Sequence, residues 1–198
     1  MVKVAKMSAK KKPKVDLNKQ DYQLELAFAK KLIARQVKLS DYPYYKSYVK
    51  TLKAEARHIK DPGRHLVIGC GPLPLSMLLI KGCTGLDRSV EAINTASEIV
   101  DNSSTLIYGK AEKFLDYSSF YSILLTLESG DTPAKKRSIL KHIHNIVDFN
   151  TVLIVRSSVT KDFVNADRII NTDMWNVVDK LSVFDGLSVS YILTKHSK

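Results

Sequence analysis

Three groups of residues between positions 66 and 112 could together hold a nucleoside-like ligand. The stretch LVIGCGPLPLSMLL, from residue 66, runs from an apolar segment through Gly69 and Gly71 into a second apolar segment. Glycine permits unusual backbone dihedrals and lets a ligand approach the main chain closely. Asp87 follows sixteen residues after Gly71, and its carboxylate could accept hydrogen bonds from both hydroxyls of a ribose. Ala111 and Glu112 follow the next apolar stretch, at a place where an adenine base is often framed in such folds.

The residues that follow the glycines favour one class of cofactor. A dinucleotide-binding turn reads GxGxxG, whereas this chain reads GCGPLP, so the last glycine is missing. Pro72 and Pro74 also lack the amide hydrogens that a pyrophosphate would need at the start of a helix. S-adenosylmethionine carries no phosphate and therefore fits this turn better. The alternative is an ordinary strand-to-helix turn in which Asp87 only caps a helix.

Alternating strands and helices must position these residues. Helices are predicted over residues 17–38, 44–59, 73–81, 89–100 and 133–147, and strands at HLVIG, CTGLD, STLIYG, YSILLTL, TVLIVRSS and VSYILTK. In the first helix, Leu24, Phe28 and Leu32, with either Leu26 or Ile33, are expected to form the buried face.

This order of elements predicts an open, doubly wound and mostly parallel α/β sheet of the class I S-adenosylmethionine-dependent methyltransferase type. In such a sheet the ligand binds at the carboxyl ends of the strands. We divide the chain into a basic tail (1–16), an N-terminal helical segment (17–60) and a Rossmann domain (61–198).

Charge and composition restrict the partners. The net charge is +11, and six lysines with no acid lie within residues 1–14. Such a tail is expected to be disordered, and it either solubilises the protein or makes a weak contact with the phosphates of a nucleic acid. No run of eighteen apolar residues and no secretory signal is present, so we expect a cytoplasmic protein outside the membrane. The two cysteines, Cys70 and Cys83, are too few for a metal site and are expected to be small buried thiols.

The most specific motifs resemble the nicotianamine synthase family. Its members read G-x-G-P-L-P-L after an apolar strand, as this chain does from Gly69. The segment YPYYKSYVKTLKAEARHI resembles their F-P-Y-Y-x-N-Y-x-K-L-x-x-x-E segment, and VLIVRSS and GLSVSYILTK resemble two of their later strands. The resemblance extends over about residues 40–198. Family members carry a larger helical domain ahead of the YPYY segment, whereas residues 1–41 precede it here.

The resemblance implies transfer of the 3-amino-3-carboxypropyl group of S-adenosylmethionine to a small-molecule amine. Methylthioadenosine would leave, and the product would be a nicotianamine-like metallophore. The amine is protonated near neutral pH, so a base must remove its proton before it can attack. The family uses a glutamate and a tyrosine near the amine. Tyr44 or Tyr45 matches the tyrosine of the motif. The family's glutamate lies upstream in its helical domain, where Glu25 is the nearest candidate by order, and Glu55, which also matches a family position, is the second candidate.

The expected site therefore has three parts. The catalytic candidates are Tyr45, Tyr44, Glu25 and Glu55. The cofactor is expected to contact Gly69, Gly71, Pro72, Leu73, Asp87, Arg88, Ala111 and Glu112. The substrate is expected to contact Glu128, Arg156 and Ser157, which follow or end the fourth and fifth predicted strands. Arg156 could hold a substrate carboxylate through a bidentate pair, or it could tie down a loop.

Two other functions compete with aminocarboxypropyl transfer. The chain could be a methyltransferase that acts on a small molecule or on RNA, in which case the by-product is S-adenosylhomocysteine. It could also be a non-catalytic relative that only binds the cofactor or a partner. The identity of the released nucleoside distinguishes these three functions.

Overall fold

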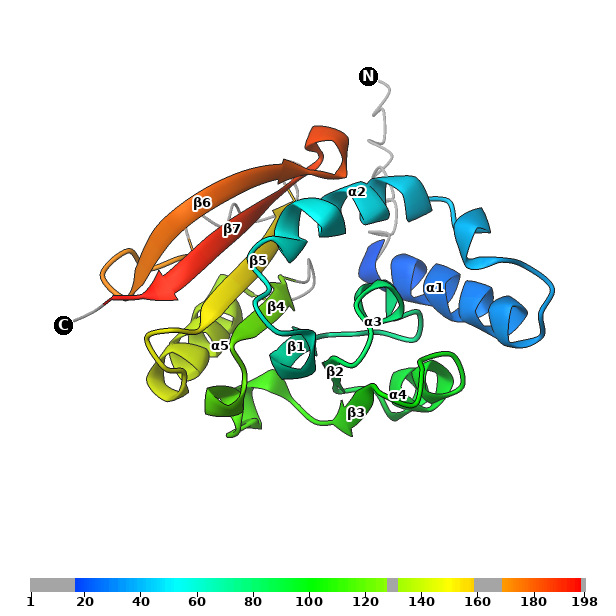
Figure 1. The fold of residues 1–198 in the computed structure, drawn as a ribbon, viewed down its shortest axis with the longest axis horizontal. Coiled ribbons are helices and arrows are strands. Elements are labelled where there is room, and N and C mark those ends of the chain that lie inside the picture. The colour runs from blue at the N-terminus through cyan, green and yellow to red at the C-terminus, as the bar shows by residue number, and fades with distance from the viewer. Residues whose placement is uncertain (1–16, 128–131, 159–168, 197–198) are drawn as a thin grey trace, which may run out of the picture.

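A seven-stranded sheet forms the centre of the computed structural model, which describes residues 17–127, 132–158 and 169–196 (Figure 1). The strand order is β3-β2-β1-β4-β5-β7-β6. β1 to β5 run parallel, whereas β7 is antiparallel to both of its neighbours. The strands are β1 (His65–Ile68), β2 (Thr84–Asp87), β3 (Thr105–Tyr108), β4 (Ser122–Thr126), β5 (Val152–Ser158), β6 (Trp175–Val183) and β7 (Ser188–Lys195). The predicted α/β sheet of the methyltransferase type is confirmed.

Five α-helices accompany the sheet in the described part of the chain. They are α1 (Leu17–Ile33), α2 (Tyr45–Ala56), α3 (Leu75–Leu79), α4 (Val90–Ser97) and α5 (Pro133–Ile146). α1 ends five residues earlier than predicted, and Arg35 adopts a left-handed backbone with φ of 56° just after it. Leu24, predicted on the buried face of α1, is 43% exposed, whereas Leu26, one of the two predicted alternatives, is buried together with Ala29.

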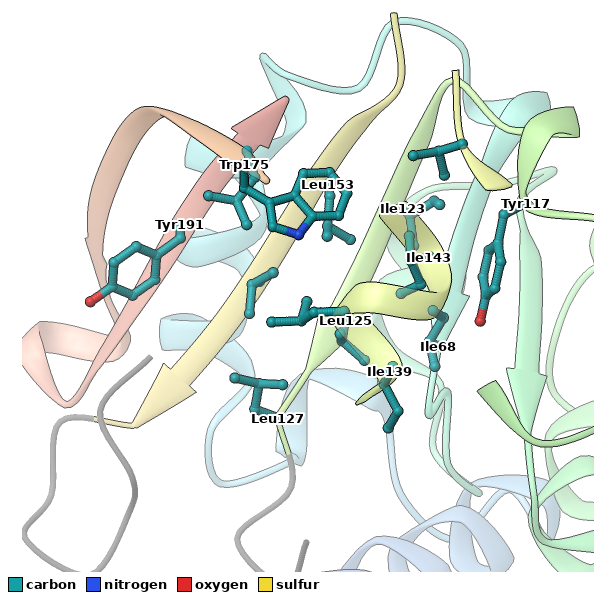
Figure 2. Close-up of a cluster of buried hydrophobic side chains, with 14 of the residues drawn as sticks. Ile68, Tyr117, Ile123, Leu125, Leu127, Ile139, Ile143, Leu153, Trp175 and Tyr191 are labelled. Atoms are coloured by element: carbon teal, nitrogen blue, oxygen red, sulfur yellow. The ribbon is translucent and has the colours of Figure 1, made fainter. Parts of the chain in front are cut away.

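The strands alternate between two hydrophobic layers, one on each face of the sheet. Leu125 and Leu153 point to the face that α5 covers, where they meet Ile139 and Ile143 (Figure 2). The intervening residues, such as Leu124, point to the opposite face and pack with residues of α3 and α4. Both faces of the central strands β1, β4 and β5 are buried, which explains why these strands are continuously apolar in the sequence.

β6 was not predicted, because its sequence does not read as a strand. Only its two ends, Trp175 and Val183, are buried, and the residues between them alternate between exposed and half-buried. The strand lies at the edge of the sheet, carries Asp179 and Lys180, and contains an irregularity in its pairing between Val177 and Asp179. Charged residues and bulges are common on edge strands because they discourage further pairing.

The carboxyl ends of β1, β2, β4 and β5 meet at one edge of the sheet, and the switch point lies between β1 and β4. β6 is antiparallel to β7 and so runs in the same direction as β5, which brings the turn between β6 and β7 to this edge. α2 contacts this turn and α3, while α1 contacts α4 (Figure 1). The two N-terminal helices thus flank the edge where ligands bind in this fold. Within the described residues, every helix is too short or too polar to cross a membrane.

Candidate active site

The turn after β1 has the geometry that its glycines predict. Gly69 and Gly71 have φ of 70° and 69°, in the left-handed region that residues with a side chain rarely adopt. The amide of Gly69 donates to the carbonyl of Leu86 at 2.8 Å, which ties the turn to the end of β2. Pro72 and Leu73 are buried below the turn, and Leu73 packs with Ala29 of α1. Pro72 and Leu73 therefore shape the turn and support α1.

Asp87 links the glycine turn to the start of α4. Its Oδ2 accepts a hydrogen bond from the amide of Gly71 at 2.9 Å, and its Oδ1 accepts one from the amide of Ser89 at 2.8 Å. Ser89 in turn caps α4, since its Oγ accepts from the amide of Ala92 at 3.2 Å. The carboxylate is thus held in one orientation beside the turn, and each of its oxygens still has a lone pair for a ribose hydroxyl.

A pocket lies at the carboxyl ends of β1, β2 and β4. Five of the eight predicted cofactor residues line it: Gly69, Asp87, Arg88, Ala111 and Glu112. Sequence reasoning missed the other side of the pocket, which comes from Leu127 after β4 and from Lys135, Lys136 and Ile139 of α5. These residues lie far from the glycine turn in the sequence, and only the sheet order brings them to it.

Glu25 of α1 lies directly over the glycine turn. Its Oε2 is 3.0 Å from the position that a Cβ atom on Gly71 would occupy, so a side chain at this position would require the carboxylate to shift. Burial, and then the nearby carboxylates of Asp21 and Asp87, raise the pKa of Glu25 from 4.5 to about 7. A carboxylate that titrates near neutral pH is suited to general base catalysis.

Of the three tyrosines in the YPYY motif, Tyr42 lies close enough to Glu25 to feel its charge. Tyr42, which was not singled out from the sequence, is buried, and its ring meets Phe28 edge-on at 5.1 Å. Burial and the charge of Glu25 raise the pKa of Tyr42. Tyr44 is 58% exposed and meets the edge of Tyr42 at 6.0 Å, whereas Tyr45 is half-buried against the same cluster. Tyr42 begins the YPYY motif, and that was the only signal for it in the sequence.

Glu55 and Arg156 form a buried ion pair between α2 and β5. Arg156 donates from Nε to Oε1 of Glu55 at 2.8 Å and from Nη2 to Oε2 at 2.5 Å. Ser190 of β7 donates to the same Oε1, and Arg156 donates from Nη1 to the hydroxyl of Tyr48 at 2.7 Å. The Tyr48 hydroxyl lies 2.7 Å from Oγ of Ser76 in α3. Both oxygens of Glu55 and all three nitrogens of the guanidinium thus have partners within the protein.

The remaining predicted substrate residues lie beside this network or outside it. Ser157 is buried next to Arg156 on β5, opposite Val189 of β7. Glu128 lies outside the described residues. That Glu128 contacts the substrate therefore stays a prediction.

The strand order, the glycine turn with its strand-ending aspartate and the adjacent pocket define an S-adenosylmethionine-dependent transferase of the methyltransferase fold. The family model described as "Nicotianamine synthase protein" matches residues 14–191. The chain therefore belongs to the nicotianamine synthase family, as its motifs predicted. No curated protein matches it.

Solved structures confirm the fold. A crystal structure of a mutant of MtNAS has a TM-score of 0.73 at 20% identity, and the match covers 89% of this chain and 72% of that one. The PH0226 protein of Pyrococcus horikoshii OT3 has a TM-score of 0.64 at 16% identity, covering 79% and 93%. The N-methyltransferase NodS of Bradyrhizobium japonicum WM9, in complex with S-adenosyl-l-homocysteine, has a TM-score of 0.64 at 13% identity, covering 87% and 99%.

Proposed function

We propose that this protein transfers the 3-amino-3-carboxypropyl group of S-adenosylmethionine to an amine and releases methylthioadenosine. Family membership supports the reaction. The assignment of roles to residues rests on one observation. Glu25, a carboxylate with a raised pKa, lies directly over the glycine turn. Asp87 would accept hydrogen bonds from the ribose, and the adenine would lie in the pocket beside Ala111 and Glu112.

The chemistry requires one proton transfer and one displacement. The amine nitrogen attacks the carbon of the aminocarboxypropyl chain that is bonded to sulfur. An N–C bond forms while the C–S bond breaks, and sulfur keeps the electron pair, so neutral methylthioadenosine leaves. Glu25 takes the proton that the ammonium group must lose. An α-amino group titrates near pH 8, so a carboxyl with a pKa of about 7 is much closer to it than an ordinary glutamate is.

Glu25 is a better candidate for the base than Glu55. The carboxylate of Glu55 is fully buried and already accepts from Arg156 and Ser190. We assign Glu55 and Arg156 a structural role, in which they hold α2 against β5, instead of contact with the amine or with a substrate carboxylate. Tyr44 and Tyr45 remain candidates for the tyrosine of the motif, and Tyr42 joins them because it faces Glu25.

The proposal extends to the product and the compartment. A nicotianamine-like product carries several amines and carboxylates and would bind metal ions. The two cysteines, Cys70 and Cys83, are free and buried, which suits the reducing cytoplasm where we expect this reaction to take place.

Identification of the released nucleoside tests the reaction. Purified protein is incubated with S-adenosylmethionine, with and without a cell extract, and the nucleosides are identified by mass. Methylthioadenosine above the level seen with heat-denatured protein is the expected result. S-adenosylhomocysteine would instead identify a methyltransferase, and the absence of both would contradict catalysis under these conditions.

Two variants test the assigned roles. Asp87→Ala is expected to weaken binding of S-adenosylmethionine about tenfold or more, because it removes a charged acceptor from the site. Glu25→Gln is expected to bind S-adenosylmethionine like the wild type but to lose most of the turnover. Glu98→Gln, at an exposed position after α4, is the control and should change neither quantity. Unchanged binding in Asp87→Ala would place the cofactor site elsewhere.

A further inference from the structure

A second residue of α1, one turn before Glu25, makes polar contacts with the start of α4. The hydroxyl of Tyr22 donates to Oε2 of Glu91 at 3.3 Å and lies 3.1 Å from Oγ of Ser89. Since Ser89 Oγ accepts from the amide of Ala92, its own proton is available for the oxygen of Tyr22. The three groups thus form a consistent chain of hydrogen bonds between the two helices.

These contacts close a ring around the glycine turn. Tyr22 meets Ser89, the amide of Ser89 donates to Asp87, and Asp87 accepts from the amide of Gly71. Gly71 in turn lies directly below the carboxylate of Glu25. Tyr22 and Glu25 are three residues apart and therefore lie on the same face of α1. The ring begins and ends on one helix.

The contact of Tyr22 with Ser89 is part-buried and directional, whereas its bond to Glu91 lies at the surface and the other described contacts of α1 are apolar or likewise at the surface. Leu26 and Ala29 are buried in apolar contacts, which are not directional and tolerate small rotations of the helix. The ion pair of Lys30 with Glu91 has a separation of 3.9 Å and lies on the surface, where such pairs contribute little. Meanwhile, the carboxylates of Glu25 and Asp87 repel each other whenever both are ionised.

We propose, on the basis of the function assigned above, that Tyr22 is a positioning residue that holds α1 against α4 and thereby keeps Glu25 over Gly71. Tyr22 itself does not touch the reacting atoms. The hydrogen bonds of its hydroxyl oppose the separation of α1 from the turn that the repulsion between the two carboxylates favours. No role is expected for it in the chemical step.

The titration of Glu25 provides the readout, because it depends on where the carboxylate lies. The ionisable groups around Glu25 are Asp21 on α1, Asp87 on β2, the buried Tyr42 and the Cys70 thiol in the turn. Tyr22→Phe removes none of these groups. If α1 loosens, water reaches Glu25 and Asp87 moves away from it, and both changes lower the pKa of Glu25 toward 4.5.

The experiment is a titration of the protein without substrate. Carboxyl resonances of protein labelled with ¹³C-glutamate are followed by NMR against pH, and the resonance of Glu25 is assigned by its loss in Glu25→Gln. In Tyr22→Phe the midpoint of this resonance is expected to fall by about one pH unit. Tyr121→Phe removes a hydroxyl from an exposed tyrosine at the opposite edge of the sheet, and its titration should match the wild type.

Glu91→Leu provides a second test that leaves Tyr22 unchanged. It removes the acceptor of the Tyr22 hydroxyl, so the midpoint of Glu25 should fall in the same direction. A Glu25 midpoint that stays at the wild-type value in both folded variants would overturn the role of Tyr22. The proposed function fails separately, if wild-type protein releases no methylthioadenosine, because the titration needs no turnover.

Discussion

At the scale of single residues, the surroundings of Glu25 are those of a catalytic carboxylate and differ from those of a surface carboxylate. In the sequence, Glu25 lies in a lysine-rich helix and by itself reads as a surface partner of a neighbouring lysine. The structure instead turns it toward the glycine turn, next to Asp21 and Asp87. The sequence predicted Glu25 only through its place in the chain order relative to the family's helical domain, because burial depends on how α1 packs against distant residues.

The raised pKa of Glu25 predicts a variant that is more stable than the wild type. Its folded value of about 7 exceeds its ordinary value of 4.5, so its cost to stability is absent below pH 4.5, grows as pH rises from 4.5 to 7, and is complete above pH 7. Glu25→Gln removes the buried charge and should increase the free energy of unfolding at pH 8 by up to about 3 kcal/mol.

Urea unfolding at pH 8 and pH 4.5 measures this effect. The difference between Glu25→Gln and the wild type should be large at pH 8 and close to zero at pH 4.5. Glu98→Gln serves again as the exposed control. A variant that is less stable than the wild type at pH 8 would mean that the ionised carboxylate has a favourable partner.

At the scale of elements, the glycine turn and α1 act as one unit. Gly71→Ala must place a Cβ atom 3.0 Å from Oε2 of Glu25, so the helix or the carboxylate has to move. We expect turnover to fall at least tenfold, and stability to fall by roughly 1–2 kcal/mol because φ is positive.

Gly186→Ala is the matched control for this substitution. Gly186 lies in the turn between β6 and β7 and also has a positive φ, of 89°, but an added Cβ atom would meet nothing within 4 Å. Gly186→Ala should therefore lose about as much stability as Gly71→Ala, whereas its release of methylthioadenosine should remain near the wild-type rate. Equal loss of turnover in both variants would indicate that backbone strain alone is responsible.

The buried pair of Glu55 and Arg156 predicts a strong effect on stability at the junction of α2 and β5. Arg156→Met leaves the carboxylate of Glu55 buried without its cation and should reduce the free energy of unfolding by roughly 3–5 kcal/mol. The double variant Glu55→Gln with Arg156→Met should lose less than the sum of the two single variants.

Chemical denaturation of the three variants measures this coupling. Lys50→Ala removes an exposed ion pair between α2 and Asp185, and it should shift the midpoint only slightly. Additive losses for Glu55 and Arg156 would contradict a coupled buried pair.

Elements with a clear apolar pattern could be predicted from the sequence, whereas the arrangement of the site residues depends on the order of the strands in the sheet. β1, β4 and β5 are buried on both faces and read as continuous apolar runs. β6 was missed, since an edge strand with charged residues resembles a loop. Gly69, Gly71 and Asp87 could be named from their spacing, but the bond from Gly71 to Asp87 and the contact of Tyr22 with α4 depend on tertiary packing.

At the scale of the whole molecule, two buried groups oppose each other in the dependence of stability on pH. His65 is fully buried at the start of β1, where its Nδ1 lies 2.8 Å from Oγ of Ser122. Burial lowers the pKa of His65 from 6.5 to about 4. The unfolded chain therefore binds a proton at pH values where folded His65 does not, and stability falls as pH drops from 6.5 to 4. Glu25 has the opposite effect between pH 7 and 4.5, because its pKa is raised in the folded state.

Between pH 4.5 and 6.5 the two contributions should nearly cancel in the wild type. Each group alone contributes a slope of about 1.4 kcal/mol per pH unit, and the two slopes have opposite signs. Glu25→Gln should therefore lose stability on acidification relative to the wild type, and His65→Asn should gain it. Free energies of unfolding in urea at pH 4.5, 5.5 and 6.5 measure the slopes, with the double variant as the control that should run parallel to the wild type. Parallel slopes for Glu25→Gln and the wild type would show that Glu25 does not titrate in this range.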